Sequence, residues 1–216
     1  MAADLFGVPT VTFRLLVVLV ILAHDRRRIV HVAVTEHPTA AWTAQQLRNA
    51  FPENESPRYL LHDRDSVVAH VATTVSAMDI QAIRTAPRAP WQNAYVERVI
   101  GSIRCECLDQ VIVLNATGLP QVVTTDLAYY LRSRTHLALG KDTPSPRPVT
   151  PPSAGRIVAI PEVGGLHFLC GLEAINPPTN SCRASASRGV SCRMPRGLTQ
   201  VAGLDASRSA VISTSR

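Results

Sequence analysis

The chain has 216 residues, 46% of them apolar and 18% charged, which excludes a fully disordered protein, a collagen and a coiled coil. Its formal net charge is +6, but residues 1–169 contribute only +2 and residues 170–216 supply the other +4. Because most of the excess charge lies in the last 47 residues, it is weak support for a nucleic-acid partner. The length predicts one domain, or one domain with an appendage.

The cysteines and the longest apolar run bear on the compartment. Five cysteines without a C-x-x-C pair predict free thiols, with neither a disulfide framework nor a structural zinc site. The longest apolar run covers the nine residues 15–23, against the ~20 that a membrane helix needs. An acidic residue before this run and D-R-R-R after it are unlike a signal peptide. We therefore expect a cytoplasmic protein without a membrane partner.

The first part of the chain predicts strands. Residues 1–10 form a plausible short first strand, and the aliphatic run 11–23 is typical of a strand that is buried on both faces. A polar turn at 24–28 separates this run from a second β-branched segment at 29–34. The two segments should therefore pair as an antiparallel hairpin.

Beyond Thr39, a possible helix N-cap, helices and strands alternate. One later helix has Val96, Ile100, Ile103 and Cys107 on a single face. We expect helix, strand, helix, strand, helix and helix over residues 39–51, 59–62, 67–78, 81–85, 93–108 and 120–134. This order predicts an α/β fold, a mixed sheet with helices on its faces.

The composition changes twice towards the C-terminus. Prolines accumulate from Thr143, where compact folding should end, and Ser and Arg accumulate without periodicity after His167. The predicted organisation is a core over residues 1–150, a Pro/Gly-rich extension over 151–169 and a disordered tail over 170–216.

Three acidic residues are the main candidates for chemistry. Asp4 lies in the first strand, Asp63 directly follows a strand, and Glu97 lies on a helix. If the two strands are neighbours, the three carboxylates converge, and they repel one another unless divalent cations lie between them. Two Mg²⁺ or Mn²⁺ ions about 3.5–4 Å apart would suit such oxygen ligands and would bracket a phosphodiester. Taken singly, each acid is more often a turn residue, a cap or a solvated side chain.

The sequence motifs around these acidic residues are a more specific signal than the acidic residues alone. Asp63 is the first residue of the motif D-R-D-S, and Glu97 is the last residue of the motif P-W-Q-N-A-Y-V-E. There are 33 residues between the two acids. Residues 127–148 hold the pattern Y-Y-x-x-x-R-x-H-x-x-L-x-x-x-T-P. In their order and spacing, these three motifs resemble those in the catalytic core of D-D-E insertion-sequence transposases with an integrase core. The resemblance covers about residues 2–167.

The resemblance implies a ribonuclease-H-like fold, a mixed five-stranded sheet with helices on both faces. It implies a DNA strand transferase with the catalytic and metal-binding residues Asp4, Asp63 and Glu97, two Mg²⁺ or Mn²⁺ ions, and a homo-oligomer that binds element ends and target DNA. In such enzymes water nicks the element end, and the freed 3′-hydroxyl then attacks target DNA. Asp65 is the rival of Asp63, which we prefer because R-x-S follows it and Asp65 stands where the family usually has Gly.

Five further residues are candidates for DNA binding or support. Asn93 lies one helical turn before Glu97, where it either contacts Glu97 or DNA or caps the helix. Arg98 and Arg104 either bind phosphates or are solvated. Arg134 and His136 either lie near DNA or tie the last helix to the core.

The sequence departs from the family pattern at both ends. The resemblance begins within a few residues of Met1, without the recognition region that family members carry before the core, and residues 170–216 look like translation in another frame. We therefore expect a truncated or frameshifted copy. The alternatives are a catalytically silent DNA-binding or protein-interaction remnant, and a general nuclease on the same fold.

Overall fold

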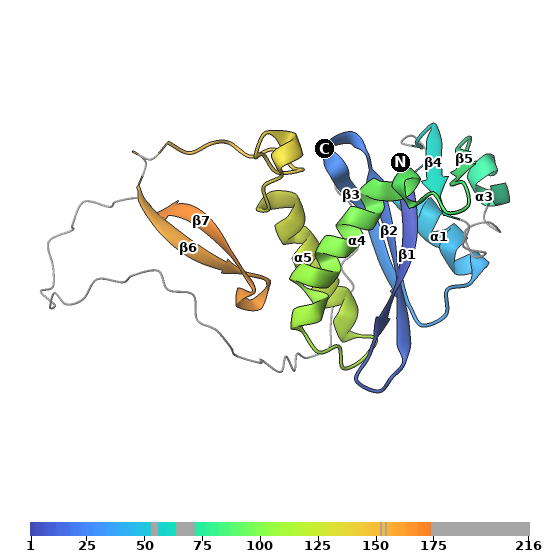
Figure 1. Cartoon of the computed structure of the whole chain (residues 1–216), viewed down its shortest axis with the longest axis horizontal. Helices are drawn as coiled ribbons and strands as arrows, with labels where there is room; N and C mark the ends of the chain where they lie inside the picture. Colours follow the sequence, from blue (N-terminus) through green and yellow to red (C-terminus); the bar gives the residue numbers. More distant parts are fainter. Residues whose placement is uncertain (53–55, 64–71, 152, 154, 174–216) are drawn as a thin grey trace, which may run out of the picture.

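The computed structural model describes residues 1–52, 56–63, 72–151, 153 and 155–173, and a five-stranded sheet forms its centre (Figure 1). The spatial order of the strands is β3-β2-β1-β4-β5. β1, β2 and β3 are antiparallel neighbours, whereas β4 pairs in parallel with both β1 and β5. The predicted mixed sheet is thus confirmed. Its strands are β1 (Ala2–Pro9), β2 (Leu15–Ala23), β3 (Arg28–Thr35), β4 (Tyr59–His62) and β5 (Gln81–Arg84).

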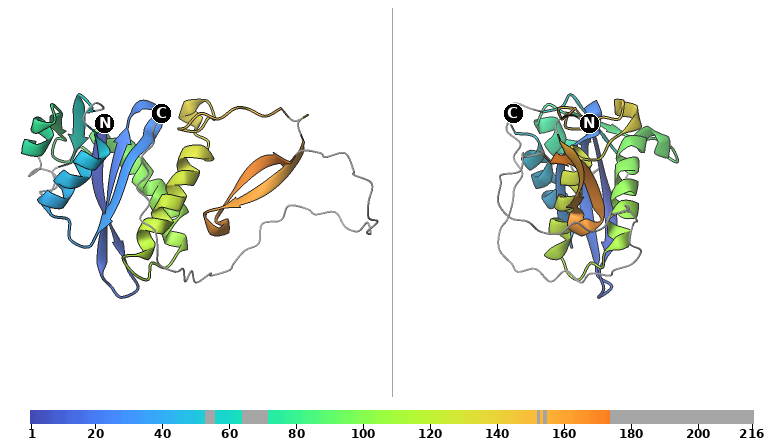
Figure 2. Two further views of the ribbon diagram at one scale, coloured as in Figure 1. Left: turned by 180° about the vertical axis from the view of Figure 1, so that it is seen from behind. Right: turned by 90° about the vertical axis from the view of Figure 1, so that its left-hand side faces the viewer.

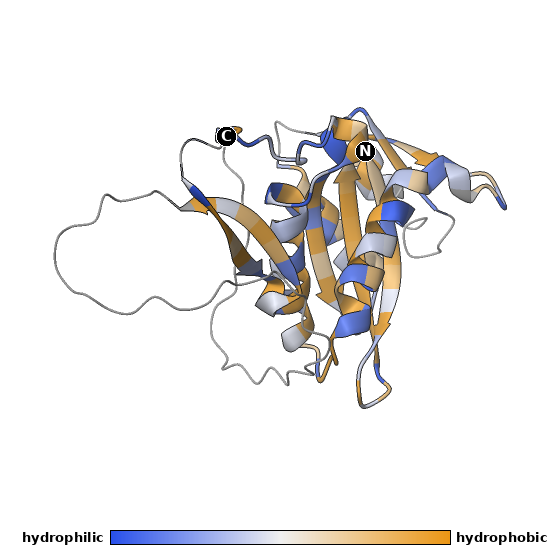
Figure 3. Cartoon of the chain, turned by 60° about the vertical axis from the view of Figure 1, so that its left-hand side comes forward, coloured by the Kyte–Doolittle hydropathy of each residue, from blue (hydrophilic) through white to orange (hydrophobic). Residues whose placement is uncertain are grey.

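β2 is buried on both faces because its side chains alternate between two cores. Leu16, Val18 and Val20 point into one core, and Leu19 and Ile21 point into the other. A strand with apolar residues at every position needs a layer of helices on each side of the sheet. Figure 3 shows this apolar centre in orange along the strands.

Two pairs of helices supply these layers. α1 (Ala40–Ala50) and α3 (Ala72–Ala77) cover one face, and α4 (Ala94–Glu106) and α5 (Gly118–Arg132) cover the other (Figure 2, right). The predicted N-cap of α1 is confirmed, because Thr39 Oγ1 accepts a hydrogen bond from the backbone N–H of Trp42. The apolar face predicted for α4 is also buried. Within the described ranges, every helix is too short or too polar to span a bilayer.

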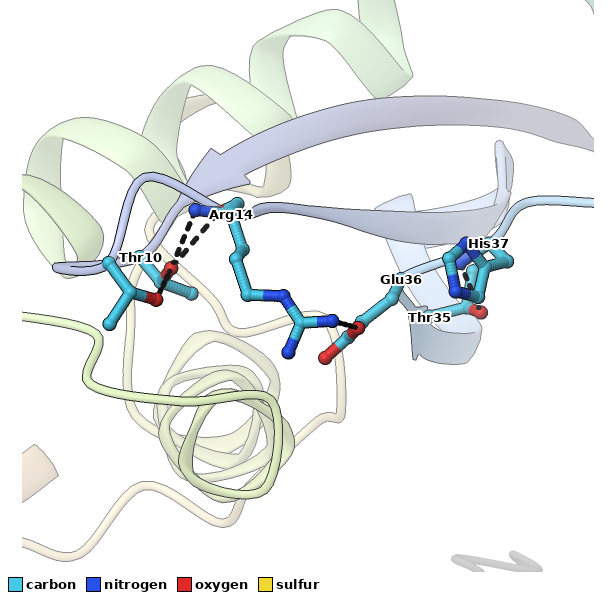
Figure 4. A network of polar contacts seen from close by, with 6 residues as sticks. Thr10, Arg14, Thr35, Glu36 and His37 are labelled. Carbon is cyan, nitrogen blue, oxygen red and sulfur yellow. Dashed lines mark hydrogen bonds and ion pairs between the residues drawn. The ribbon is translucent and has the colours of Figure 1, made fainter.

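Two predicted boundaries are wrong or untested. The strand expected over 11–23 begins only at Leu15, because the chain turns at residues 10–14. The Thr10 side chain closes this turn through hydrogen bonds with the backbone of Arg14, and the Arg14 guanidinium forms an ion pair of 2.5 Å with Glu36 (Figure 4). The helix expected over 67–78 is seen as α3, and its earlier part lies outside the described residues.

A second, two-stranded sheet lies beside α5, at the left of Figure 1. It consists of β6 (Arg156–Glu162) and β7 (His167–Glu173), which pair antiparallel. The His167 ring stacks on the Tyr129 ring at 4.2 Å, and the Ser133 hydroxyl donates to Glu162 at 2.9 Å.

This hairpin corrects two expectations about the C-terminal part. Compact folding does not end near Thr143, and the disordered tail predicted from residue 170 would start inside β7. Sequence patterns gave a weak signal here because a short hairpin gains its stability from packing against a helix, as this one does on α5. The rest of the predicted tail, residues 174–216, lies outside the described residues.

Candidate active site

Asp4 and Asp63 occupy matching positions on adjacent parallel strands. The last paired residues of β1 and β4 are Ala3 and His62, and the two aspartates are the next residues along each strand. Adjacent strands lie about 4.8 Å apart, so the two backbones are close at this point. Ala2 and Phe6 point into the core under α4, and by alternation Asp4 points to that same face.

Glu97 shares a pocket with each of the two aspartates. It is in the first turn of α4, where the positive end of the helix dipole favours a carboxylate. Glu97 lines two pockets: one of about 150 Å³ that also contains Asp63, and a shallower one of about 340 Å³ that also contains Asp4. Glu97 therefore lies on the wall of both pockets, whereas the two aspartates line different ones.

Two contacts fix how the aspartates point. The Thr85 hydroxyl donates a hydrogen bond of 2.7 Å to Asp63 Oδ1. Asp4 Oδ1 accepts one of 2.8 Å from the backbone N–H of Leu5. Thr85 is 4% exposed and directly follows β5, the parallel neighbour of β4, so it reaches Asp63 from the next strand of the sheet.

Asn93 is a buried amide in the pocket of Asp63 and Glu97. It is 4% exposed, and neither Oδ1 nor Nδ2 has a hydrogen-bond partner within the described part of the chain. Asn93 occupies the N-cap position of α4, as the alternative predicted, but its side chain makes no capping hydrogen bond. A buried amide without partners is costly, and a ligand in this pocket that donates and accepts hydrogen bonds would satisfy it.

The fit of these residues to a metal is mixed. Carboxylate oxygens are the ligands that Mg²⁺ and Mn²⁺ prefer, so the chemistry of Asp4, Asp63 and Glu97 suits such ions. Among the described residues, however, no three His, Cys, Asp or Glu side chains are grouped closely enough to hold an ion. Asp65, the rival second acid, lies outside the described residues.

The four other candidate residues differ in exposure. Arg98 and Arg104 are exposed on α4, and Arg104 lines the pocket of Asp4 with its guanidinium over the Phe6 ring. Arg134 makes hydrogen bonds of 2.8 and 2.5 Å to Glu106, and His136 is buried with its ring against Tyr130. The contacts of these last two side chains are thus internal, and their predicted contact with DNA stays a prediction.

Comparisons with known proteins place this geometry in context. Residues 78–144 match the family profile described as "Integrase core domain". A chain in the cryoEM structure of the simian T-cell lymphotropic virus intasome, in complex with PP2A regulatory subunit B56 gamma, has a similar structure, with a TM-score of 0.54 and 14% identity. That similarity covers 78% of this chain and 64% of the viral chain, so this protein spans less than two thirds of it.

The fold is that of an integrase catalytic core. The HTLV-2 integrase catalytic core domain, solved as a dimer in complex with magnesium, is also similar, with a TM-score of 0.47 and 12% identity over 66% of this chain and 90% of that one. No curated protein matches this chain in sequence.

Two residues that line the pocket of Asp63 were not predicted from the sequence. Thr85 and Arg88 line the pocket of Asp63, and Thr85 bonds to it. A signal for Thr85 did exist, since it is the last residue of the strand predicted over 81–85, and ligands in such sheets gather at the carboxyl ends of parallel strands. The signal was weak because a single threonine after a strand is common.

A second polar cluster of the integrase-like core contains Asp126 of α5, Glu106 and Arg134, and none of these residues lines the pockets of Asp4 and Asp63. Burial raises the pKa of Asp126 to about 7, the charge of Glu106 adds to this rise, and Arg134 opposes it. Burial, helped by Asp126, raises the pKa of the Cys107 thiol to about 12. His167 of β7 lies 3.9 Å from Asp126, so this cluster joins the hairpin to the core.

Proposed function

We propose that this protein acts on DNA as a strand transferase or endonuclease of a transposable element, of the bacterial insertion-sequence kind. The pocket that contains Asp63, Asn93 and Glu97 is the observation that carries this proposal. The integrase-core profile at residues 78–144 supports it independently. The proposed place of action is DNA in the bacterial cytoplasm, and the proposed working form is a homo-oligomer that binds element ends and target DNA.

The acidic residues have the central role in this mechanism. Asp4, Asp63 and Glu97 would hold divalent cations, Mg²⁺ or Mn²⁺, with two ions expected. Such ions, when bound, supply activation of a water or 3′-hydroxyl and stabilisation of the leaving oxygen at a phosphodiester. Thr85 would help to orient the Asp63 carboxylate, to which it donates a hydrogen bond of 2.7 Å. Asn93 would bind the nucleotide beside the scissile phosphate, because its buried amide has both a donor and an acceptor to offer.

The products would be a nicked element end and then a joined target strand. Arg88, in the pocket of Asp63, and Arg104, in that of Asp4, would offset the charge of DNA phosphates that approach the three carboxylates. Without positively charged side chains such as these, the three carboxylates would repel the phosphates of the substrate.

The test is an assay of nicking and strand joining on plasmid and oligonucleotide DNA, with Mg²⁺ or Mn²⁺. The wild type should nick DNA only with the metal, and Asp63→Asn and Glu97→Gln should each lose that activity. Asp79→Asn is a matched control, since Asp79 is exposed, lies outside both pockets and has a φ of 57° that asparagine tolerates. Equal activity in the wild type and both variants would refute the catalytic assignment.

A catalytically silent DNA-binding or protein-interaction module is the second candidate. The observation in its favour is that Asp4 and Asp63 line different pockets. Salt-sensitive DNA binding without any metal-dependent chemistry would identify it. Cleavage without strand joining would instead indicate a general nuclease on the same fold.

A further inference from the structure

A group of basic and aromatic side chains lies around Tyr95 of α4, which leaves the helix about 200° from Glu97. His24 and Arg27 come from the turn between β2 and β3, and Tyr95 and Arg98 come from α4. The His24 ring lies 5.5 Å from the Tyr95 ring, and the Arg27 guanidinium lies 5.3 Å from the centre of that ring. Tyr95 is 50% exposed, and His24 and Arg98 are exposed too. We call these four residues the arginine–tyrosine surface.

The β2–β3 turn holds this surface in a fixed position. Arg26 and Arg27 have φ values of 47° and 56°, in the left-handed region that arginine rarely adopts. Arg26 ties the turn to the chain after α5, with hydrogen bonds to the Asp142 carboxylate and to the carbonyl oxygens of Thr143 and Pro144. Arg27 is thereby left beside Tyr95.

The positive charge of the surface is not neutralised within the described part of the chain. There, Arg27 and Arg98 make no salt bridge, whereas Arg26 and Arg134 each bind a carboxylate. Burial raises the pKa of the Tyr130 phenol, and the charges of Arg134, Arg27 and Arg98 oppose this rise. The charges of Arg27 and Arg98 thus act on the same side chain, the buried Tyr130.

The surface is separate from the cleavage pocket. Tyr95 and Glu97 are two positions apart on α4, so their side chains leave the helix about 200° apart. Neither Arg27 nor Tyr95 lines either pocket of the acidic residues. A ligand on this surface would thus lie across a single helix from the scissile bond.

We propose that the arginine–tyrosine surface binds the phosphate backbone of a DNA segment outside the cleavage pocket. This inference rests on the proposed action on DNA. Arginine guanidinium groups bind phosphates through paired hydrogen bonds, and an exposed aromatic ring offers a face on which an unpaired base stacks. Together, arginines without acidic partners and an exposed tyrosine fit nucleic acid better than an acidic protein surface, which has no bases to stack.

The experiment measures binding of a fluorescent 30-base-pair duplex with a single-stranded extension at one end to the full chain, without divalent metal, at several salt concentrations. Arg27→Gln/Arg98→Gln should weaken binding about tenfold at low salt and reduce the slope of log K against log salt by about 2, one per lost phosphate contact. Arg27→Lys/Arg98→Lys keeps both charges but loses the paired hydrogen bonds, so it should keep the salt slope of the wild type and bind more tightly than the glutamine variant.

The matched control is Arg48→Gln/Arg58→Gln, which also removes two exposed positive charges. Arg58 lies over the Tyr59 ring at 5.1 Å, so the control removes a similar arginine–tyrosine contact elsewhere. It should bind as the wild type does. Equal binding by the Arg27/Arg98 glutamine variant and the wild type, equal loss in the control, or no binding by the wild type would each overturn the proposal.

Nicking assays separate this inference from the proposed function. If the wild type binds DNA through the surface but never nicks it with metal, the catalytic proposal fails and this inference stands. If the wild type nicks DNA while the Arg27/Arg98 glutamine variant binds normally, the inference fails and the catalytic proposal stands. Circular dichroism of each variant shows that the fold is kept, and the lysine variant separates loss of charge from loss of structure.

Discussion

The Thr85 hydroxyl donates a hydrogen bond of 2.7 Å to Oδ1 of Asp63, across the carboxyl ends of the neighbouring parallel strands β5 and β4. The backbone supports the same contact, since the N–H of Thr85 donates to the carbonyl of His62 at 3.0 Å. Because Asp63 directly follows β4, a partner on the next strand is one contact that limits how its carboxylate turns. Thr85 is therefore a positioning residue for the proposed catalytic carboxylate.

Replacing Thr85 tests this role. Thr85→Val removes the donor at nearly constant volume and should lower metal-dependent nicking about tenfold, in the range usual for partners of metal-binding carboxylates. The loss should shrink as the Mg²⁺ concentration rises, because a less ordered carboxylate binds the ion more weakly. Thr85→Ser keeps the hydroxyl and should keep most of the activity. If the loss does not depend on Mg²⁺, or if Thr85→Ser loses as much as Thr85→Val, the role is structural.

Asp4 has a prediction of its own, since it lines the pocket that does not contain Asp63. If Asp4 binds metal in the working enzyme, Asp4→Asn should abolish nicking as fully as Asp63→Asn and leave DNA binding without metal unchanged. The comparison uses nicking rates with Mn²⁺ and binding of the same duplex in EDTA. Retention of more than about a tenth of the wild-type rate would contradict the role of Asp4, since loss of a catalytic carboxylate costs several orders of magnitude.

Asp126 predicts how stability depends on pH. Its pKa rises from 3.8 to about 7 on folding, so between these values the folded chain binds the proton more tightly than the unfolded chain does. The contribution of Asp126 to the free energy of unfolding is therefore most favourable below about pH 4. It falls as the pH rises towards 7 and is constant above that, with a total change of up to about 4 kcal/mol.

Urea unfolding at pH 5 and pH 8 measures this effect. Asp126→Asn removes the titrating group, so it should be more stable than the wild type at pH 8 and lose less stability between the two pH values. Asp109→Asn, at an exposed aspartate, should behave as the wild type does. Parallel pH profiles for Asp126→Asn and the wild type would show that Asp126 is not protonated in the folded chain.

Cys105 and Cys107 should differ in reactivity although one residue separates them. Cys105 is exposed, whereas Cys107 is fully buried and burial raises the pKa of its thiol to about 12. Since the thiolate is the reactive form, iodoacetamide at pH 8 should label Cys105 and spare Cys107 until the chain unfolds. Peptide mapping by mass spectrometry measures both sites in one sample. Equal labelling of the two in the folded protein would contradict the burial of Cys107.

Patterns that depend on local spacing were predictable from the sequence. The unbroken apolar run of β2 and the face of Val96, Ile100, Ile103 and Cys107 on α4 are patterns within short stretches of chain, and both are buried as predicted. The sequence motifs around Asp63 and Glu97 also indicated an integrase-like core, and the observed fold agrees with this prediction. These features depend on neighbours in the chain, so a single sequence carries them.

Features that depend on contacts between distant segments were not predictable in the same way. The β6–β7 hairpin is held by Tyr129 and Ser133 of α5 and its vicinity, far from it in the chain, and its own residues read as a Pro/Gly-rich extension and the start of a disordered tail. The partnership of Thr85 with Asp63 and the burial of Asn93 depend on which strands lie side by side.

The sequence by itself determined the class of fold, the order of its central elements and the three acidic candidates, because side-chain periodicity and short motifs are properties of the chain. Only the tertiary structure decided that Glu97 lines the pockets of both Asp4 and Asp63 and that Thr85 bonds to Asp63. It also decided which arginines of the core can attract an anionic partner. Arg26 and Arg134 are each paired with a carboxylate, whereas Arg27 and Arg98 make no ion pair within the described residues. A net charge sums over residues regardless of place, whereas an interaction needs two groups within a few ångströms, and folding alone sets that distance.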